Sequence, residues 1–330
     1  MKMRALASKA IAIALALGAL VPKLAAAQDW PNRPVTMVVP LAAGSGIDVV
    51  GRILAPRLAE LLGQQVIVEN VGGAGGMTGA SRVARATPDG YQFLLGGTGT
   101  HAQNQTLYKH PLYSAATDFA PVALVAEQPI VLIARKDMPV DGLQEFIAYA
   151  KTNQGKMQYG SAGAGSAAHL ACVLLDAAIG VTVTHVPYRG GGPAMQDLIA
   201  GRIDYQCPLI TIAIQQIESK TVKGIANLSR NRSPSLPNLP SAHEQGLINF
   251  DASNWSAFFL PKDTPAAIVQ KLHIATIAAM NTPSVRARLK EIGADLVTPE
   301  RTSPAYLQKF VESEIEKWAA PIRASGVTGE

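Results

Sequence analysis

The chain has few aromatic residues, few charged residues and 2 cysteines among its 330 residues. Aromatic side chains make up 5% and charged side chains 16% of the sequence, whereas hydrophobic residues make up 48%. A disordered protein would be poor in apolar residues and rich in charge, so this composition excludes one. At roughly 150 residues per domain the length predicts two domains, each able to bury its own core.

Acidic residues are absent from the first 27 positions, and this local lack explains the basic balance of the chain. The sequence has 29 Lys+Arg against 24 Asp+Glu. Four of the basic residues, Lys2, Arg4, Lys9 and Lys23, lie in this segment, which leaves 25 against 24 in the remainder. The excess positive charge therefore belongs to the leader, and no nucleic-acid partner is expected.

The same segment has the composition of a signal peptide. A basic stretch at residues 2–9 precedes an apolar stretch at 10–21 and the small residues 25–27. The apolar stretch is too short to span a bilayer, and no later run is long enough to do so. We expect residues 1–27 to be removed near Ala27 and the mature chain to reside in a bacterial periplasm.

Cys172 and Cys207 are the only cysteines of the chain. In an oxidising compartment they can form a disulfide that closes a loop of about 35 residues and stabilises the fold by about 3 kcal/mol in the chain-entropy model. The alternative is a pair of buried free thiols, because free cysteine is among the most buried residue types. We favour the bridge because the chain is expected to be exported.

Short apolar strands alternate with glycine-rich loops and helices along the mature chain. This alternation predicts mostly parallel sheets flanked by helices. The pattern restarts near residue 130, so we expect two α/β lobes of similar construction. Two packing helices follow Thr264-Pro265 and Ser303-Pro304, which have the order of an N-cap and a first helical residue. The strands are expected at 35–39, 66–68, 91–95, 130–133 and 181–186.

The common catalytic, cofactor and metal motifs are missing. Gly44-Ser45-Gly46 lacks the lysine of a P-loop, and neither glycine-rich loop completes G-x-G-x-x-G. A nucleophile elbow needs a glycine two residues before its serine, whereas Tyr159 and Ala164 occupy that position before Ser161 and Ser166, and the six histidines are scattered. We therefore expect no catalytic residue, no metal site and no cofactor.

Two loops rich in glycine and serine, 41–48 and 160–166, remain as the candidate site. Each lies between a strand and the N-terminus of a helix, where backbone N–H groups and the helix dipole favour an anion. At the carboxyl ends of the strands of two facing lobes, they would hold a small anion between them. The alternative is that the glycines serve only tight strand-to-helix turns.

Several side chains near these loops are candidates for ligand contact. Asp48 can accept a hydrogen bond from a ligand, or it can cap the helix that follows. His101 and Asn104 follow the third strand and are expected to line the cleft, while His169 is expected to pack within its helix. Tyr188 offers an apolar face and a hydroxyl with which to close over the ligand.

Longer segments match a known family with similar spacing. They are residues 30–34, 38–48, 62–70, 73–76, 88–91, 159–166, 169–170, 185–190 and 239–246, together with Trp255. On these segments the chain resembles the Bug family of periplasmic solute-binding proteins, the TctC-like receptors of tripartite tricarboxylate transport systems. The first loop departs from the family's usual Pro-Phe-x-x-Gly-Gly because Ser45 replaces a glycine, which adds a hydroxyl and stiffens the loop.

The resemblance implies a two-lobed α/β architecture, the type II periplasmic-binding-protein fold, with mixed, mostly parallel sheets and a ligand cleft between the lobes. The first lobe is expected to comprise 28–127 and 251–330, and the second 128–250. The resemblance also implies that the loops hold carboxylates through backbone N–H groups and ordered water. The expected ligand-binding residues are Leu41, Ala42, Ala43, Ser45, Gly46, Asp48, Thr98, His101, Asn104, Ser161, Ala162, Gly163, Ser166, Tyr188 and Asp204.

We therefore expect a monomeric receptor that captures a small organic carboxylate by lobe closure and performs no chemistry. Its liganded form would be recognised by membrane transporter subunits or by a sensor kinase. Two alternatives stay open: an output that is purely signalling, and an exported enzyme that uses the same cleft with Asp48 as a base.

Overall fold

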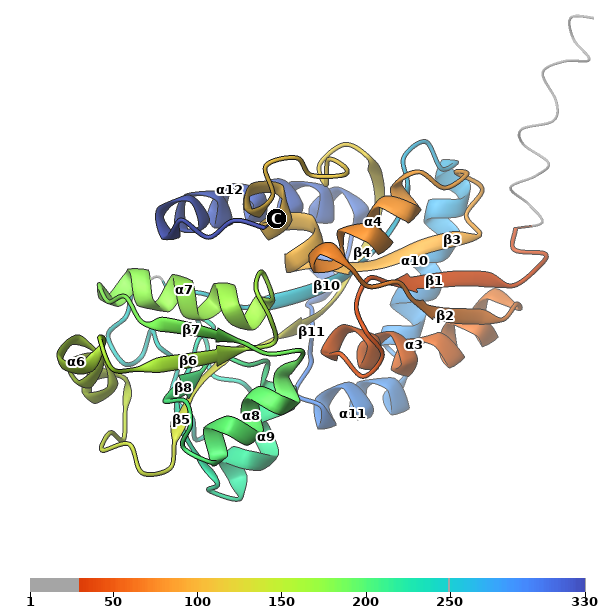
Figure 1. Cartoon of the computed structure of the whole chain (residues 1–330). Coiled ribbons are helices and arrows are strands. Elements are labelled where there is room, and N and C mark those ends of the chain that lie inside the picture. Colours follow the sequence, from red (N-terminus) through yellow and green to blue (C-terminus); the bar gives the residue numbers. More distant parts are fainter. Residues whose placement is uncertain (1–29, 249, 330) are drawn as a thin grey trace, which may run out of the picture.

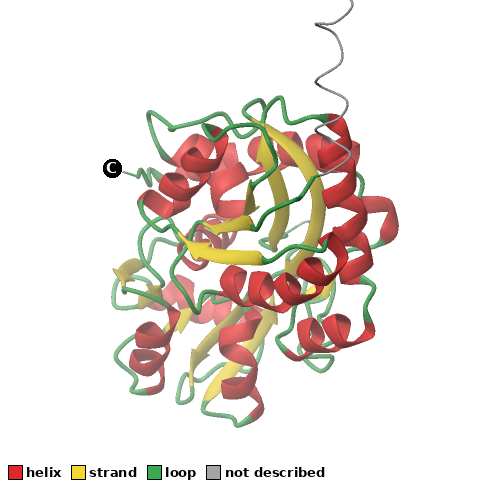
Figure 2. Ribbon diagram, turned by 90° about the vertical axis from the view of Figure 1, so that its right-hand side faces the viewer, coloured by secondary structure: helices red, strands yellow, loops and turns green. Residues whose placement is uncertain are grey.

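The computed structural model describes residues 30–248 and 250–329, and the expected leader with its cleavage site near Ala27 lies outside these ranges. The chain forms two lobes, each built around one mixed sheet (Figure 1). In both lobes the strands lie inside and helices cover them (Figure 2). Within the described ranges, no helix has both the length and the apolar composition needed to cross a bilayer.

The first lobe contains a six-stranded sheet in the order β11-β4-β10-β3-β1-β2. Strand β1 pairs in parallel with β2 and β3, while β10 is antiparallel to β3 and β4. The strands are β1 (Val35–Val39), β2 (Val66–Asn70), β3 (Gln92–Gly97), β4 (Phe119–Gln128), β10 (Asn254–Pro261) and β11 (Asp295–Leu296). The helices are α3 (Gly46–Leu62), α4 (Met77–Ala84), α5 (Asn104–Leu107), α10 (Ala266–Met280), α11 (Pro283–Glu291) and α12 (Pro304–Ser325), with short helical turns at Ala74–Gly76, Gly99–Gln103 and Pro299–Arg301.

The second lobe contains a five-stranded sheet in the order β7-β6-β8-β5-β9. Strand β6 pairs in parallel with β7 and β8, and β5 is antiparallel to β8 and β9. The strands are β5 (Val131–Arg135), β6 (Gln158–Ser161), β7 (Thr184–Pro187), β8 (Tyr205–Gln206) and β9 (Val222–Asn227). The helices are α6 (Leu143–Asn153), α7 (Ala167–Ile179), α8 (Gly191–Ile199) and α9 (Ile210–Glu218).

The lobes are joined by the connections β4–β5 and β9–β10 and by the last helix. Helix α12 packs against β4 and α5 of the first lobe and also against α7 of the second (Figure 1). Trp318 on α12 is 1% exposed. A helix buried against both lobes ties the C-terminal part of the chain to each of them.

The predicted pattern of strands and helices is confirmed in outline. Ser303 caps α12 as expected, because its hydroxyl accepts from the Tyr306 N–H at 3.1 Å. Thr264 does not cap α10; its hydroxyl donates to the Pro261 carbonyl at 2.7 Å, and the helix begins at Ala266. The Cys172–Cys207 disulfide is confirmed and joins α7 to the residue after β8, with a Cα–Cα distance of 5.5 Å.

Candidate functional site

The carboxyl ends of several strands meet between the lobes. In the first lobe β1, β3 and β4 run in the same direction, and in the second lobe β6, β7 and β8 do. The two edges touch: a Cβ on Gly46 would lie 2.8 Å from the Leu209 Cδ1, and one on Gly165 would lie 2.7 Å from the Leu107 Cδ2. Each of the two loops predicted to bind the ligand therefore lies against the opposite lobe.

The first loop is held by Asp48, which is 1% exposed. Its carboxylate accepts from the Gly44 N–H at 2.8 Å, from the Asn70 amide at 2.9 Å and from the Arg52 Nε at 2.9 Å. Burial alone would raise the pKa of Asp48, but these hydrogen bonds and the Arg52 charge hold it below its usual range. Asp48 therefore fixes the shape of the loop as an ion.

The cap of α3 is Ser45 and not Asp48, so that predicted alternative for Asp48 is wrong. The Ser45 hydroxyl accepts from the Asp48 N–H at 3.4 Å. The N–H groups of Gly46 and Ile47 have no acceptor among the described residues, as geometry requires in the first turn of a helix. The adjacent residues Leu41, Ala42 and Ala43 are exposed. This end of the first lobe thus presents free backbone donors.

The second loop is fixed by hydrogen bonds within itself and to α7. Ser166 caps α7 by accepting from the His169 N–H at 3.3 Å, and it donates to the Gly163 carbonyl at 2.7 Å. The Gly165 N–H donates to the His169 Nδ1 at 3.0 Å. Burial lowers the pKa of His169 to about 4, so this ring is neutral and can accept. His169 packs in its helix as expected and in addition holds the loop.

The N-terminus of α7 also offers free donors. The N–H groups of Ala167 and Ala168 have no acceptor within the part of the chain that the structure describes. Ala162, at the start of the loop, is half-buried. Like α3 in the first lobe, α7 directs unpaired N–H groups and the positive end of its dipole towards the lobe interface.

Ser161 and His185 form a pair that sequence reasoning did not find. The Ser161 Oγ lies 2.7 Å from the His185 Nε2, and it also accepts from the Gly163 N–H at 3.1 Å. The same hydroxyl donates to the Gly163 carbonyl at 3.0 Å, which leaves His185 to donate through Nε2. Because Ser161 is 2% exposed, the pair serves to hold the end of β6 and the start of the loop.

Two of the predicted ligand contacts, Asp204 and His101, lie away from the lobe interface. Asp204 lies at the amino edge of the second sheet, where it pairs with Arg135 at 3.0 Å and accepts from the Gln158 N–H at 2.8 Å. His101 is 0% exposed and stacks on Phe259 inside the first lobe, and burial lowers its pKa to about 3. It therefore does not line the interface.

Thr98 and Asn104 position the backbone next to the interface. The Thr98 hydroxyl accepts from the Trp255 N–H at 2.9 Å and holds the end of β3 against β10. The Asn104 amide donates to the Gly75 carbonyl at 3.0 Å. Tyr188 is half-buried, and its hydroxyl donates to the Asp197 carboxylate on α8 at 2.7 Å, so only its ring remains to face a ligand.

Two buried glutamines were missed by sequence reasoning. Gln128 ends β4 and is 0% exposed, and Gln206 ends β8 and is 2% exposed. Both amide atoms of Gln128 and the Nε2 of Gln206 lack partners among the described residues. Gln128 faces Gly46, and Gln206 lies beside Gly160. Neither strand was recognised from the sequence, so nothing marked these residues as strand ends.

The structure offers no metal-binding cluster within the described residues, since no three His, Cys, Asp or Glu side chains are grouped to hold an ion. The candidate site consists of the N-termini of α3 and α7, the small residues of the two loops and the neutral amides of Gln128 and Gln206. Such donors match the polarity of an anion.

Comparison with known proteins adds an independent line of evidence. Residues 50–327 match the family model described as the tripartite tricarboxylate transporter family receptor. The periplasmic binding protein BugD is 40% identical, with a TM-score of 0.81 over 91% of this chain and 100% of that one. MatC of Rhodopseudomonas palustris, solved with bound malate, is 38% identical, with a TM-score of 0.81 over 89% and 100%. An adipate-bound protein of R. palustris is 34% identical, with a TM-score of 0.82 over 91% and 99%.

Proposed function

The chain belongs to the tripartite tricarboxylate transporter receptor family, a family of solute-binding proteins, and from this premise we propose that it captures a small organic carboxylate between its two lobes. The observation that carries the proposal is the pair of helix N-termini, of α3 and α7, whose unpaired N–H groups follow loops that each lie against the opposite lobe. Malate and adipate, the dicarboxylates named with two relatives, support a ligand that is a small organic carboxylate.

In this proposal the ligand carboxylate is bound by backbone dipoles and not by an ion pair. Arg52, the cation next to the first loop, is already engaged by Asp48 and by the Asn70 amide at 2.9 Å. Gln128 and Gln206 supply neutral donors for the remaining polar groups of the ligand. The exposed residues Leu41, Ala42 and Ala43, with Ala162 and Gly163 opposite, would close over it.

The moving parts are the two lobes, with 28–127 and 251–330 in one and 128–250 in the other. Membership of the two sheets supports this division. Export to the periplasm is supported by the relative BugD, a periplasmic binding protein, and we propose that residues 1–27 are removed near Ala27. The closed, liganded monomer would then be recognised by membrane transporter subunits; a sensor kinase is the alternative partner.

We also propose that the site performs no chemistry on its ligand. Ser161 and His185 are the pair from which a nucleophile would be built. The Ser161 hydroxyl is buried and is committed to the Gly163 backbone, and Asp48, the other candidate base, is held by three donors. A bound carboxylate recovered unchanged after prolonged incubation supports a receptor, whereas a converted one would show an enzyme.

The proposal is tested by thermal unfolding of residues 28–330 after refolding, which removes any co-purified ligand. The panel contains mono-, di- and tricarboxylates. A ligand at 100 times its dissociation constant adds about 2.7 kcal/mol to stability, which raises the unfolding midpoint by several degrees. If no carboxylate raises the midpoint of the refolded protein, the proposal is wrong.

A matched pair of variants locates the site. Ser166→Ala removes the cap of α7 at the interface, and Ser303→Ala removes the equivalent cap of α12. Each loses about 1 kcal/mol of stability with its cap. We expect carboxylate affinity to fall only in Ser166→Ala; an equal loss in both variants would argue against binding at the α7 N-terminus.

A further inference from the structure

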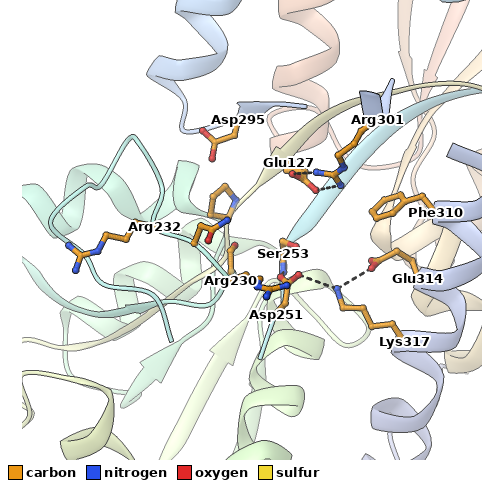
Figure 3. Close-up of a pocket in the computed structure, with 13 residues that line it drawn as sticks. Glu127, Arg230, Arg232, Asp251, Ser253, Asp295, Arg301, Phe310, Glu314 and Lys317 are labelled. Carbon is orange, nitrogen blue, oxygen red and sulfur yellow. Dashed lines mark hydrogen bonds and ion pairs between the residues drawn. The ribbon is translucent and has the colours of Figure 1, made fainter. Parts of the chain in front are cut away.

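A second polar cavity lies on the other side of β4 from the proposed carboxylate site. Successive residues of a strand point to opposite faces, so Gln128 faces Gly46 while Glu127 points into this cavity. The cavity has a volume of about 280 Å³. We call it the rear cavity; its walls come from the ends of both inter-lobe connections, from β11 and from α12 (Figure 3).

Most charges in the rear cavity are already paired. Arg301 makes two hydrogen bonds to Glu127, at 2.6 and 2.8 Å. Lys317 lies 3.0 Å from Glu314 and 3.6 Å from Asp251 (Figure 3). The first contact joins the turn before α12 to β4, and Lys317 joins α12 to the segment before β10. Two cations thus face three carboxylates, and each of these five groups has a partner.

Arg232 points away from the centre of the rear cavity (Figure 3) and pairs with Glu244 at 2.9 Å. Its charge is therefore also satisfied, and it adds nothing to the cavity. Two further charged residues, Arg230 and Asp295, line the walls.

The side chains of Arg230, which is exposed, and of Asp295, which is half-buried, have no hydrogen bond or ion pair to any described residue. Arg230 lies on the connection that leaves β9, and Asp295 lies on β11 opposite Glu127 in the sheet register. Burial and the neighbouring Glu127 charge raise the pKa of Asp295 to about 6. The single cation beside this carboxylate pair, Arg301, is committed to Glu127, so the cavity leaves one unpaired charge of each sign on different walls.

We propose that the rear cavity binds a small zwitterionic amino acid, whose carboxylate pairs with Arg230 and whose ammonium pairs with Asp295. A dicarboxylate would place its second charge against Asp295 and Glu127, and a diamine would place one against Arg230 and Lys317. One charge of each sign in one molecule satisfies both walls. The volume lies at the lower end for small-molecule sites, which favours a ligand of few atoms.

The buried hydroxyl of Ser229 supports a polar occupant. Its Oγ has no partner among the described residues, although it lines the same cavity next to Arg230. A buried hydroxyl without a partner is unfavourable, and a ligand carboxylate bound at Arg230 would accept its hydrogen bond. The proposed ligand thus satisfies three groups that the chain itself leaves unpaired.

The test uses residues 28–330 and a series of amino acids of increasing length: glycine, β-alanine, 4-aminobutyrate and 5-aminovalerate. Acetate and methylammonium, each with one charge, are the controls. We expect one member of the series to raise the unfolding midpoint more than either single-charge control does. Any rise with acetate should be the same in Arg230→Gln, because it would come from the site between the lobes. The proposal is overturned if no member of the series raises it, or if acetate or methylammonium raises it equally.

Variants separate the rear cavity from the site between the lobes. Arg230→Gln and Asp295→Asn each remove one unpaired charge with little change in shape. Ser166→Ala alters only the proposed carboxylate site between the lobes. We expect amino-acid affinity to fall at least tenfold in both rear variants and to persist in Ser166→Ala, while simple carboxylates still stabilise the rear variants. If the amino acid binds both Arg230→Gln and Asp295→Asn with normal affinity, it occupies the carboxylate site between the lobes and the proposal fails.

Discussion

Replacing Gln206 is expected to raise the stability of the unliganded protein and to weaken ligand binding. Its Nε2 is buried without a partner, so replacing Gln206 by methionine removes an unsatisfied group and should raise the unfolding free energy of the unliganded protein by about 1 kcal/mol. If the amide serves the ligand, the same variant should bind the carboxylate about tenfold more weakly, since one hydrogen bond is worth roughly that factor. Urea unfolding and calorimetric titration measure the two effects.

Gln245 provides the matched control, because its amide is fully used within the chain. Its Oε1 accepts from the Leu143 N–H at 2.8 Å, and its Nε2 donates to the Ile225 carbonyl at 2.9 Å. Gln245→Met should therefore lose stability and keep its affinity. Unchanged carboxylate binding in Gln206→Met would show that the unpaired amide is not a ligand group.

Asp176 predicts a pH dependence whose sign differs from that of a paired surface carboxylate. It is 6% exposed and accepts from the Tyr205 hydroxyl at 2.6 and 2.8 Å, yet burial raises its pKa to about 7. The native state then holds a proton that the unfolded state releases near its ordinary pKa of 3.8. Stability from this group is present at low pH and declines as pH rises from about 4 to about 7.

Asp176→Asn tests this sign. The amide keeps an acceptor for Tyr205 and cannot ionise. The unfolding free energy of the variant should therefore rise relative to that of the wild type as pH rises, by on the order of 4 kcal/mol at most between pH 4 and pH 8. The measurement is urea unfolding of both proteins at several pH values. Parallel pH profiles would mean that Asp176 titrates near its ordinary pKa in the fold.

At the scale of single elements, the helices beside the site were predictable because residues close to each helix end determine where the helix begins and ends. Helix α3 begins after the cap Ser45 and ends at Gly63 with φ 72°, and α7 begins after Ser166 and ends at Gly180 with φ 72°. Serine caps and left-handed glycines act over one turn, so short segments of sequence suffice to place them.

The strands that complete the sheets were not predictable in the same way. All 8 residues of β10 are buried, so it lacks the alternation of a half-exposed strand, and β4 contains Pro121. Strand β8 has 2 residues, too few for any pattern. Asp204 was expected at the site, but the structure places it at the start of β8, on the opposite edge of the sheet. Gln128 and Gln206 were missed because β4 and β8 were not recognised from the sequence.

The disulfide is a further prediction at this scale, because it connects α7 to the end of β8. Replacing both Cys172 and Cys207 by serine should lower the unfolding free energy by about 2–4 kcal/mol, chiefly because the unfolded chain gains freedom. Urea unfolding of the variant and the wild type measures the loss. Both cysteines are 0% exposed, so reductant added to the folded wild type is the control and should cause little change before unfolding. Equal stability of variant and wild type would contradict the prediction.

At the scale of the whole molecule, ligand affinity depends on how the lobes meet. Helices α3 and α7, which carry the free N–H groups, belong to different lobes, and the glycine at the start of α3 and the one before α7 each lie against the opposite lobe. A ligand that binds both sets of donors favours the closed arrangement by its differential affinity for that state. A change that opposes closure must therefore weaken binding even if it leaves each lobe intact.

Gly46 offers a direct test of this coupling, because a methyl group there would lie 2.8 Å from the Leu209 Cδ1 of the other lobe. Overpacking of this kind costs about 1–3 kcal/mol, so Gly46→Ala should weaken carboxylate binding about tenfold. The Leu209→Ala variant alone should bind nearly normally, and combining it with Gly46→Ala should restore most of the affinity. Gly192→Ala is the control, since a Cβ there meets nothing within 4 Å. Calorimetric titration of the four variants decides the matter: a double variant as weak as Gly46→Ala would mean that the methyl group excludes the ligand and does not obstruct the lobes.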